Sequence, residues 1–249
     1  MQRERSEEEQ TTQRYNIEDV LPAELLSHIL QMLPEESVAP ASRTCRRWFS
    51  CSPPCLRKKL SLRWACSSLP AIQWARANRC PWNHWVCAHA ARHGRLEVLQ
   101  WARANRCPWS RETCNNAAEN GHLHVLQWAR ENGCPWGIDT SDNASKKGHL
   151  EVLRWARENG CPWHHWTCAF AAENGHLHVL RWARANRCPW SEETCNSAAE
   201  NGHLHVLQWA RENGCPWNHE LICDRAYMNG HLELLQWAKD NRPEKTKRK

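Results

Sequence analysis

Phenylalanine, tyrosine and long apolar runs are scarce in this sequence. It has 2 Phe and 2 Tyr against 17 Trp, and no stretch approaches the ~20 apolar residues that cross a membrane. The opening ten residues, MQRERSEEEQ, are charged and contain no apolar signal region. We therefore expect a chain without a membrane segment that works in the cytoplasm, a reducing compartment, with a nuclear location left open.

Motifs that carry catalysis are missing as well. The sequence has no glycine-rich phosphate loop, no isolated nucleophile with an orienting pair and no cluster with metal-ligand spacing. Its 15 cysteines invite a zinc or disulfide interpretation, and Cys107 could in principle meet Cys114. Most of them recur at a fixed step, however, which favours small buried apolar residues over ligands. We expect no enzymatic activity, no cofactor and no metal.

What the sequence does have is a repeat. The tripeptide Cys-Pro-Trp returns every 27 residues, beginning at Cys80, Cys107, Cys134, Cys161, Cys188 and Cys215. A fixed period of this kind is typical of a solenoid, in which each unit buries its apolar face only against its neighbours.

Each unit is predicted to form two helices. In the second half, Leu123–Asn132 has a wide apolar arc at helical spacing, and Asn132-Gly133 supplies a left-handed ending. In the first half, Ser110 is placed as N-cap and Asn120-Gly121 ends the helix. The tryptophans recur at two positions of the unit, which predicts that they are core residues.

Basic residues follow the second helices as a regular ladder. Its members are Arg76, Arg103, Arg130, Arg157, Arg184 and Arg211. Such ladders are usually solvated helix faces with buried stems, so nucleic-acid binding is disfavoured.

Positions that vary between units are the candidates for target binding. The third residue after each Cys-Pro-Trp is Trp85, Glu112, Asp139, Trp166, Glu193 and Glu220. The helix dipole explains the acids but not the tryptophans, which suit an exposed hot spot unless they fold over the neighbouring unit. The full candidate set is Trp85, Trp166, His84, His165 and Phe170.

The N-terminal part of the sequence resembles an F-box. Residues 21–34 read LPAELLSHILQMLP and residues 44–48 read TCRRW, similar to the two linked helix motifs of that family. The resemblance implies docking on a Skp1-like protein and, through it, on a cullin. The docking residues it implies are Leu21, Pro22, Leu25, Leu26, Ile29 and Leu30.

The repeat resembles the ankyrin family. Residues 113–133, TCNNAAENGHLHVLQWARENG, are similar to its Thr-Pro-Leu-His pattern, but the unit is about six residues shorter than the usual 33. The missing residues would come from the hairpin between units, so projecting β-fingers are not expected. The Cys-Pro-Trp variant joined to an F-box is similar to a class abundant in giant DNA viruses of amoebae, which would place the chain in host cytoplasm.

The expected fold is therefore all-α, a three-helix F-box followed by an α-solenoid of ankyrin-like helix pairs. The expected segments are a disordered N-terminus at 1–16, an F-box at 17–55, a linker at 56–68, an array of a half unit plus six units at 69–242 and a basic tail at 243–249. These resemblances imply a substrate adaptor of an SCF-type ubiquitin ligase. The alternative is a repeat scaffold that sequesters a partner without ubiquitination.

Overall fold

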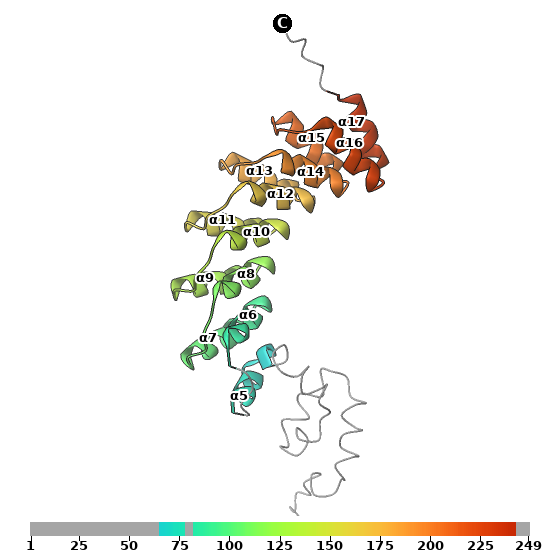
Figure 1. Cartoon of the computed structure of the whole chain (residues 1–249). Helices are drawn as coiled ribbons and strands as arrows, with labels where there is room; N and C mark the ends of the chain where they lie inside the picture. Colours follow the sequence, from blue (N-terminus) through green and yellow to red (C-terminus); the bar gives the residue numbers. More distant parts are fainter. Residues whose placement is uncertain (1–64, 78–81, 243–249) are drawn as a thin grey trace, which may run out of the picture. The chain divides into compact units, whose positions relative to one another are not determined.

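The computed structural model describes residues 65–77 and 82–242 (Figure 1). The chain divides into two compact units, Met1–Pro81 and Trp82–Lys249. In the first unit, the described residues form a short 3₁₀ helix, η3 (Ala65–Ser67), and the helix α5 (Leu69–Ala77). Helix α5 corresponds to the half unit that was expected to open the array.

Several predictions fall on residues that the structure does not describe. The F-box at 17–55 with all six docking residues lies outside the described residues, and so does the basic tail. The segment boundaries predicted from the sequence stay predictions.

The described residues of the second compact part of the chain, 82–242, form paired helices, as expected for the repeat. The first helix of each pair is α6 (His84–Arg92), α8 (Arg111–Glu119), α10 (Ile138–Lys146), α12 (His165–Glu173), α14 (Glu192–Glu200) or α16 (His219–Met228). The second helix is α7 (Leu96–Ala104), α9 (Leu123–Glu131), α11 (Leu150–Glu158), α13 (Leu177–Ala185), α15 (Leu204–Glu212) or α17 (Leu232–Asp240). Residues 65–77 and 82–242 contain no β-strand, so the all-α prediction is confirmed for them.

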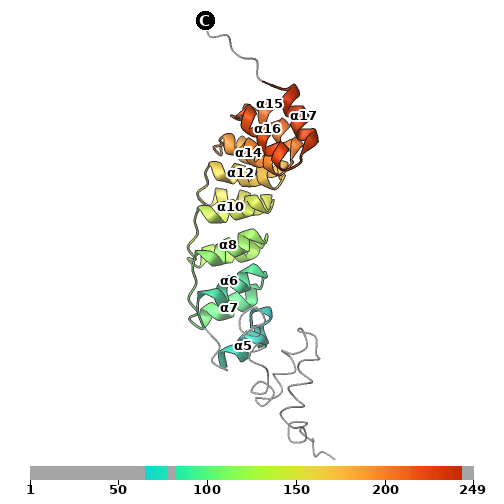
Figure 2. The ribbon, with the colours of Figure 1, turned by 45° about the vertical axis from the view of Figure 1, so that its right-hand side comes forward.

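The first helices of the pairs form one continuous stack. Each packs on the first helix of the next pair, from α6 on α8 to α14 on α16, and each second helix packs on the first helix of its own pair. Figure 2 shows the first helices stacked in one row. Every helix pair therefore depends on its neighbours for burial, as expected for a solenoid.

The core lies between the helices and is made of small and branched side chains. In the second pair, Ala117 and Ala118 are fully buried on α8, and Val125, Leu126 and Ala129 are fully buried on α9. The alanines carry only a methyl group, which lets neighbouring helices approach closely. Each fully buried leucine contributes about 1.5–3 kcal/mol relative to exposure.

The recurring tryptophans are not part of this core. Trp109 and Trp128 are both half-buried, and so are their equivalents in the other pairs of the second unit. The two rings of a pair meet edge to face, with centroids 6.0 Å apart for Trp109 and Trp128. The prediction that the tryptophans are core residues is therefore wrong. Buried alanine, valine and leucine side chains fill the space between the helices, and the indoles lie at the edge of each pair.

The arginine ladder lies on these indoles. The guanidinium of Arg130 is 4.2 Å from the ring centroid of Trp136 in the next unit, and it also donates a hydrogen bond to the Cys134 carbonyl. Four equivalent stacks repeat the contact, at Arg103, Arg157, Arg184 and Arg211. These heads are held by aromatic faces rather than simply solvated, which corrects the sequence interpretation.

Two different glycine turns close the helices α8 and α9. Gly121 ends α8 with φ 73° and Gly133 follows α9 with φ 81°, as predicted for both. A Cβ on Gly121 would lie 2.8 Å from the imidazole of His149 in the next unit, whereas nothing lies within 4 Å of one on Gly133. Packing between units therefore restricts Gly121, whereas only its left-handed backbone restricts Gly133, and arginine takes that conformation at Arg106 and Arg187.

The cysteines connect consecutive units. The thiol of Cys134 donates to the carbonyl of Ser110, 3.4 Å away in the preceding unit. The partner of Cys114 is Cys134 of the next unit and not Cys107, in agreement with the sequence interpretation, which disfavoured a cysteine pair within one unit. The hydrogen bond with Cys134 and burial raise the pKa of the Cys114 thiol. Both side chains are fully buried free thiols, in agreement with the interpretation as small buried residues.

Candidate functional site

The two tryptophans predicted to contact a target are exposed. Trp85 has 45% and Trp166 39% of its surface accessible, in the first turns of α6 and α12. They do not fold away over the neighbouring units. The backbone of Trp85 is held by Asn83, the N-cap of α6, whose side-chain oxygen accepts from the Trp85 N–H at 3.1 Å.

The other predicted residues gather beside these tryptophans. The rings of His84 and Trp85 are 5.0 Å apart, and those of His165 and Trp166 are 5.5 Å apart. Phe170 lies one helical turn after Trp166, with ring centroids 5.9 Å apart. The structure therefore brings the five predicted residues into two groups, one on α6 and one on α12.

The sequence interpretation missed Ile138. This side chain is 40% exposed at the start of α10, which packs against α12. Its position is held by a polar or charged residue in the other units, namely His84, Arg111, His165, Glu192 and His219. An apolar residue in a column of polar ones was the signal that could have identified it.

We call the surface formed by the N-terminal turns of the first helices the first-helix face. Its members are Trp85, Ile138, Trp166, Phe170 and the acids Glu112, Asp139, Glu192, Glu193 and Glu220, none of which is buried. Because the first helices pack side by side, equivalent residues of successive units follow one another along this face. The face is suited to binding a partner with apolar and polar contacts.

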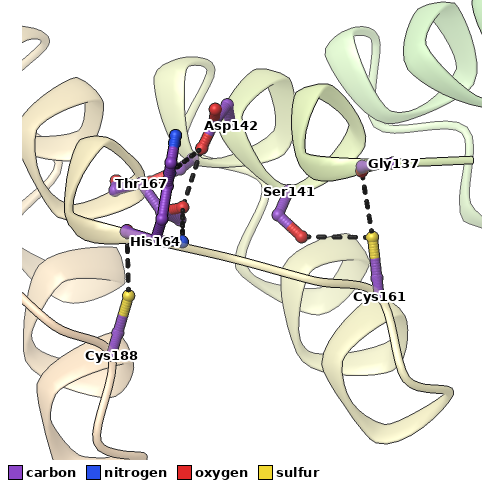
Figure 3. A network of polar contacts seen from close by, with 8 residues as sticks. Gly137, Ser141, Asp142, Cys161, His164, Thr167 and Cys188 are labelled. Carbon is purple, nitrogen blue, oxygen red and sulfur yellow. Dashed lines mark hydrogen bonds and ion pairs between the residues drawn. The ribbon is translucent and has the colours of Figure 1, made fainter.

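A buried polar network supports the part of the face that carries Trp166 (Figure 3). The hydroxyl of Thr167 donates to Asp142 Oδ1 at 2.7 Å, linking α12 to α10. The backbone N–H of His164, the N-cap of α12, donates to the Thr167 hydroxyl at 3.2 Å. The thiol of Cys188 donates to the His164 carbonyl at 3.5 Å. The first turn of α12 is therefore fixed from both neighbouring units.

The carboxyl group of Asp142 is the charged member of this network. Burial raises the pKa of Asp142, and the hydrogen bond from Thr167 and the nearby His164 imidazole oppose that rise. His164 Nδ1 lies 3.6 Å from Asp142 Oδ1. The carboxylate accepts bonds that orient α12, which is a positioning role.

A second branch of the network replaces a thiol pair. Ser141 occupies the position of Cys114, and its hydroxyl donates to the Cys161 thiol at 3.2 Å (Figure 3). That thiol in turn lies 3.4 Å from the Gly137 carbonyl. Ser141 therefore contacts the thiol of the next unit, as Cys114 contacts Cys134.

The histidines of the Gly-His turns join the units. His149 Nε2 lies 3.1 Å from the Glu119 carbonyl of the preceding unit, and His203 Nε2 lies 3.0 Å from that of Glu173. Burial lowers the pKa of His122, His176 and His203. Burial therefore favours the neutral form of these three imidazoles at the junctions between units. Among the residues that the structure describes, no three His, Cys, Asp or Glu side chains are arranged to hold a metal ion.

The fold of the array has a solved counterpart. It matches the ankyrin repeat domain of human ASB11, over 65% of this chain and 86% of that one, with a TM-score of 0.54 and 16% sequence identity. The array is an ankyrin-type solenoid with shortened units, as the sequence resemblance implied.

The N-terminal part of the chain matches a second family. Residues 19–63 fit the F-box-like family, so the chain combines an F-box-like region with ankyrin-like repeats. No curated protein matched the sequence. No helix in the described ranges has the length and apolarity needed to cross a membrane.

Proposed function

We propose that this chain is a substrate adaptor of an SCF-type cullin-RING ubiquitin ligase. The F-box-like region docks on a Skp1-like protein through Leu21, Pro22, Leu25, Leu26, Ile29 and Leu30, and the array captures the target protein. The chain does no chemistry itself. It raises the local concentration of the target near the conjugating enzyme, in the cytoplasm.

The observation that carries the proposal is the combination of two binding parts in one chain. Residues 19–63 match the F-box-like family, and the ankyrin-type array exposes Trp85 and Trp166. Exposed tryptophans are frequent anchors of protein interfaces, because a large apolar surface is removed from water on binding.

Co-purification of the full chain with a Skp1-like protein tests the docking step. Leu25→Asp places a charge in the proposed apolar docking surface, so recovery of the Skp1-like protein is expected to fall to background. Trp166→Ser is the matched control, because it alters the array and should leave that recovery unchanged. Unchanged recovery with Leu25→Asp contradicts the docking proposal.

A reconstituted ubiquitination assay separates the adaptor from a sequestering scaffold. The adaptor requires target ubiquitination that depends on both Leu25 and Trp166. A target that binds the array but is not ubiquitinated when the ligase is complete would favour the scaffold.

A further inference from the structure

Six large apolar side chains in the described residues are exposed, and they form two groups with different explanations. Tyr227, Met228 and Leu232 belong to the last helix pair. Nothing lies within 4 Å of a Cβ on Gly230 in that pair, whereas a histidine of the next unit covers Gly202 at the equivalent turn. These side chains are exposed because the array ends there. Ile138 and Trp166 lie on α10 and α12, which pack against first helices on both sides, so the end of the array does not account for their exposure.

The apolar residues are concentrated on α10 and α12. Trp166 and Phe170 contact each other on α12, and Ile138 begins the helix packed beside it. Lys146 Nζ lies 5.7 Å from the Phe170 ring centroid and 3.9 Å from a Glu173 carboxylate oxygen. The aliphatic and aromatic surface is therefore bordered by a cation that is already paired.

Unpaired carboxylates surround the same surface. Asp139 follows Ile138 on α10, and Glu192 and Glu193 begin α14, which packs against α12. Within residues 82–242, none of these three carboxylates forms an ion pair. The chain as a whole carries a net charge of +6, while Arg157 and Arg184 stack on tryptophans after the second helices. Asp139, Glu192 and Glu193 thus supply negative charge beside the exposed apolar residues, while Arg111 begins α8 on the other side of α10.

A weaker copy of this surface lies three units earlier. Trp85 and Glu112 correspond to Trp166 and Glu193, each 81 residues apart. Other surface positions differ, since His89 stands for Phe170, Arg92 for Glu173 and Arg111 for Glu192. The earlier copy has the tryptophan anchor with less apolar surface and less negative charge.

We infer that the first-helix face over α10, α12 and α14 binds a target segment in which a bulky apolar side chain is flanked by lysine or arginine residues. The apolar side chain packs on Trp166 and Phe170, and the basic residues face Asp139, Glu192 and Glu193. The face over α6 and α8 binds the same kind of segment more weakly. The inference deepens the proposed function, because it assigns the chemistry of the target that the adaptor captures.

Selection of a displayed library of random peptides on the full chain tests this inference. Peptides with a bulky apolar residue between basic residues are expected to be enriched. A fluorescent consensus peptide is then titrated by anisotropy, against copies with Lys and Arg replaced by Glu or with the apolar residue replaced by Ser. Both replacements should abolish binding.

Residue exchanges between the two copies give variants that the fold already accommodates. Phe170→His with Glu192→Arg gives the stronger copy the residues of the weaker one at two surface positions and should weaken consensus binding at least about tenfold. Arg111→Glu with His89→Phe should strengthen binding at the earlier copy. Ser197→Asn, another natural difference between the copies, is the matched control and should change nothing.

Three results would overturn the inference: no enriched basic-apolar consensus, equal binding of the Glu-substituted peptide, or no effect of the exchanges. Self-association of the chain that disappears in Trp166→Ser, measured by sedimentation, would assign the face to a second copy and also overturn it. Recovery of the Skp1-like protein is measured in parallel. Peptide binding without recovery of the Skp1-like protein would refute the adaptor proposal and support the peptide site. Recovery of the Skp1-like protein without peptide binding would refute only the peptide site.

Discussion

Two units of this protein have almost the same sequence but differ in the hydrogen bonding of a buried asparagine. Residues 107–133 and 188–214 differ at two positions, where Arg111 and Asn116 are replaced by Glu192 and Ser197. In the earlier unit, the Asn115 side-chain oxygen accepts a hydrogen bond from the Thr140 hydroxyl at 2.8 Å. In the later unit, the equivalent Asn196 is fully buried and neither of its amide atoms has a partner.

This difference in hydrogen bonding comes from the helix that packs against each asparagine, because the two units themselves carry the same residue there. Helix α10 supplies Thr140 opposite Asn115. Helix α16, the first helix of the last pair, has Leu221 at the corresponding position. The preceding unit likewise decides whether a buried threonine finds an acceptor. Thr167 bonds to Asp142, while Thr194 faces the position of Ala169 and lacks this acceptor. In a solenoid, the stability of a unit is therefore decided at its junctions.

The largest effect should separate the two glycine turns of one unit. Gly121→Ala combines a left-handed backbone with a Cβ 2.8 Å from His149, and we expect it to lower the free energy of unfolding by about 3 kcal/mol. Gly133→Ala meets no neighbour and should cost about 1 kcal/mol. Urea unfolding followed by circular dichroism measures both. Equal losses would show that His149 yields without cost.

The second prediction tests the two asparagines directly. Asn115→Ala leaves the buried Thr140 hydroxyl without its acceptor and should cost about 2 kcal/mol. Asn196→Ala removes two unpaired buried atoms and should be neutral or slightly stabilising, since Ala already occupies this position at Ala88 and Ala169. The same urea titration compares them. A loss with Asn196→Ala as large as that with Asn115→Ala would contradict the role assigned to the junction.

The third prediction concerns the charged junction at Asp142. Asp142→Asn keeps an oxygen acceptor for Thr167 and removes a partly buried charge, so a gain of about 1 kcal/mol is expected at pH 7. Because burial raises the pKa of Asp142 in the folded chain, the unfolded chain loses this proton first. Stability should therefore fall as pH rises from the ordinary pKa of an aspartate through the raised one.

The pH dependence of the Asp142 variant supplies the check. The unfolding free energies of wild type and Asp142→Asn are measured from pH 3 to pH 8. The value for wild type minus that for the variant should decrease as pH rises from the ordinary pKa of an aspartate through the raised pKa of Asp142. A difference that is constant with pH would show that the carboxyl is not perturbed by folding.

The smallest effect is expected at two left-handed arginines. Arg106 and Arg187 have φ 58° and 65° at the position held by Gly133 in other units. Arg106→Gly and Arg187→Gly should each stabilise the array by about 0.5 kcal/mol, since the relief of backbone strain exceeds the added freedom of the unfolded chain. Gln100→Gly, in the middle of α7, is the control and should destabilise by about 1 kcal/mol. Thermal unfolding of the three variants measures the order.

Much of the fold could be predicted because it depends on local chemistry repeated at a fixed step. The period located the helix pairs, and the Asn-Gly turns located both helix ends of the unit at Gly121 and Gly133. Ser110 was correctly placed as the N-cap of α8, although its side chain makes no capping bond. Such features involve residues a few positions apart, so a single sequence contains the information.

The candidate site was predictable in part. Trp85 and Trp166 could be selected because they interrupt a column of acids, but their exposure depends on what the neighbouring helices leave uncovered. Ile138 joins them for the same reason. The repeat pattern does not show which residues of α10 and α14 lie around α12, because that requires the packing of helices from different units.

The amino-acid sequence alone thus established the repeat, the helix pairs and the all-α class, since these follow from periodicity and from turn residues that act locally. The tertiary structure decided that indoles lie at the edge of each pair instead of filling the core, that Cys114 faces Cys134, and that equal asparagines differ in their partners. Each of these depends on contacts between residues 19 or more positions apart, and only the packing of the helices in three dimensions determines them.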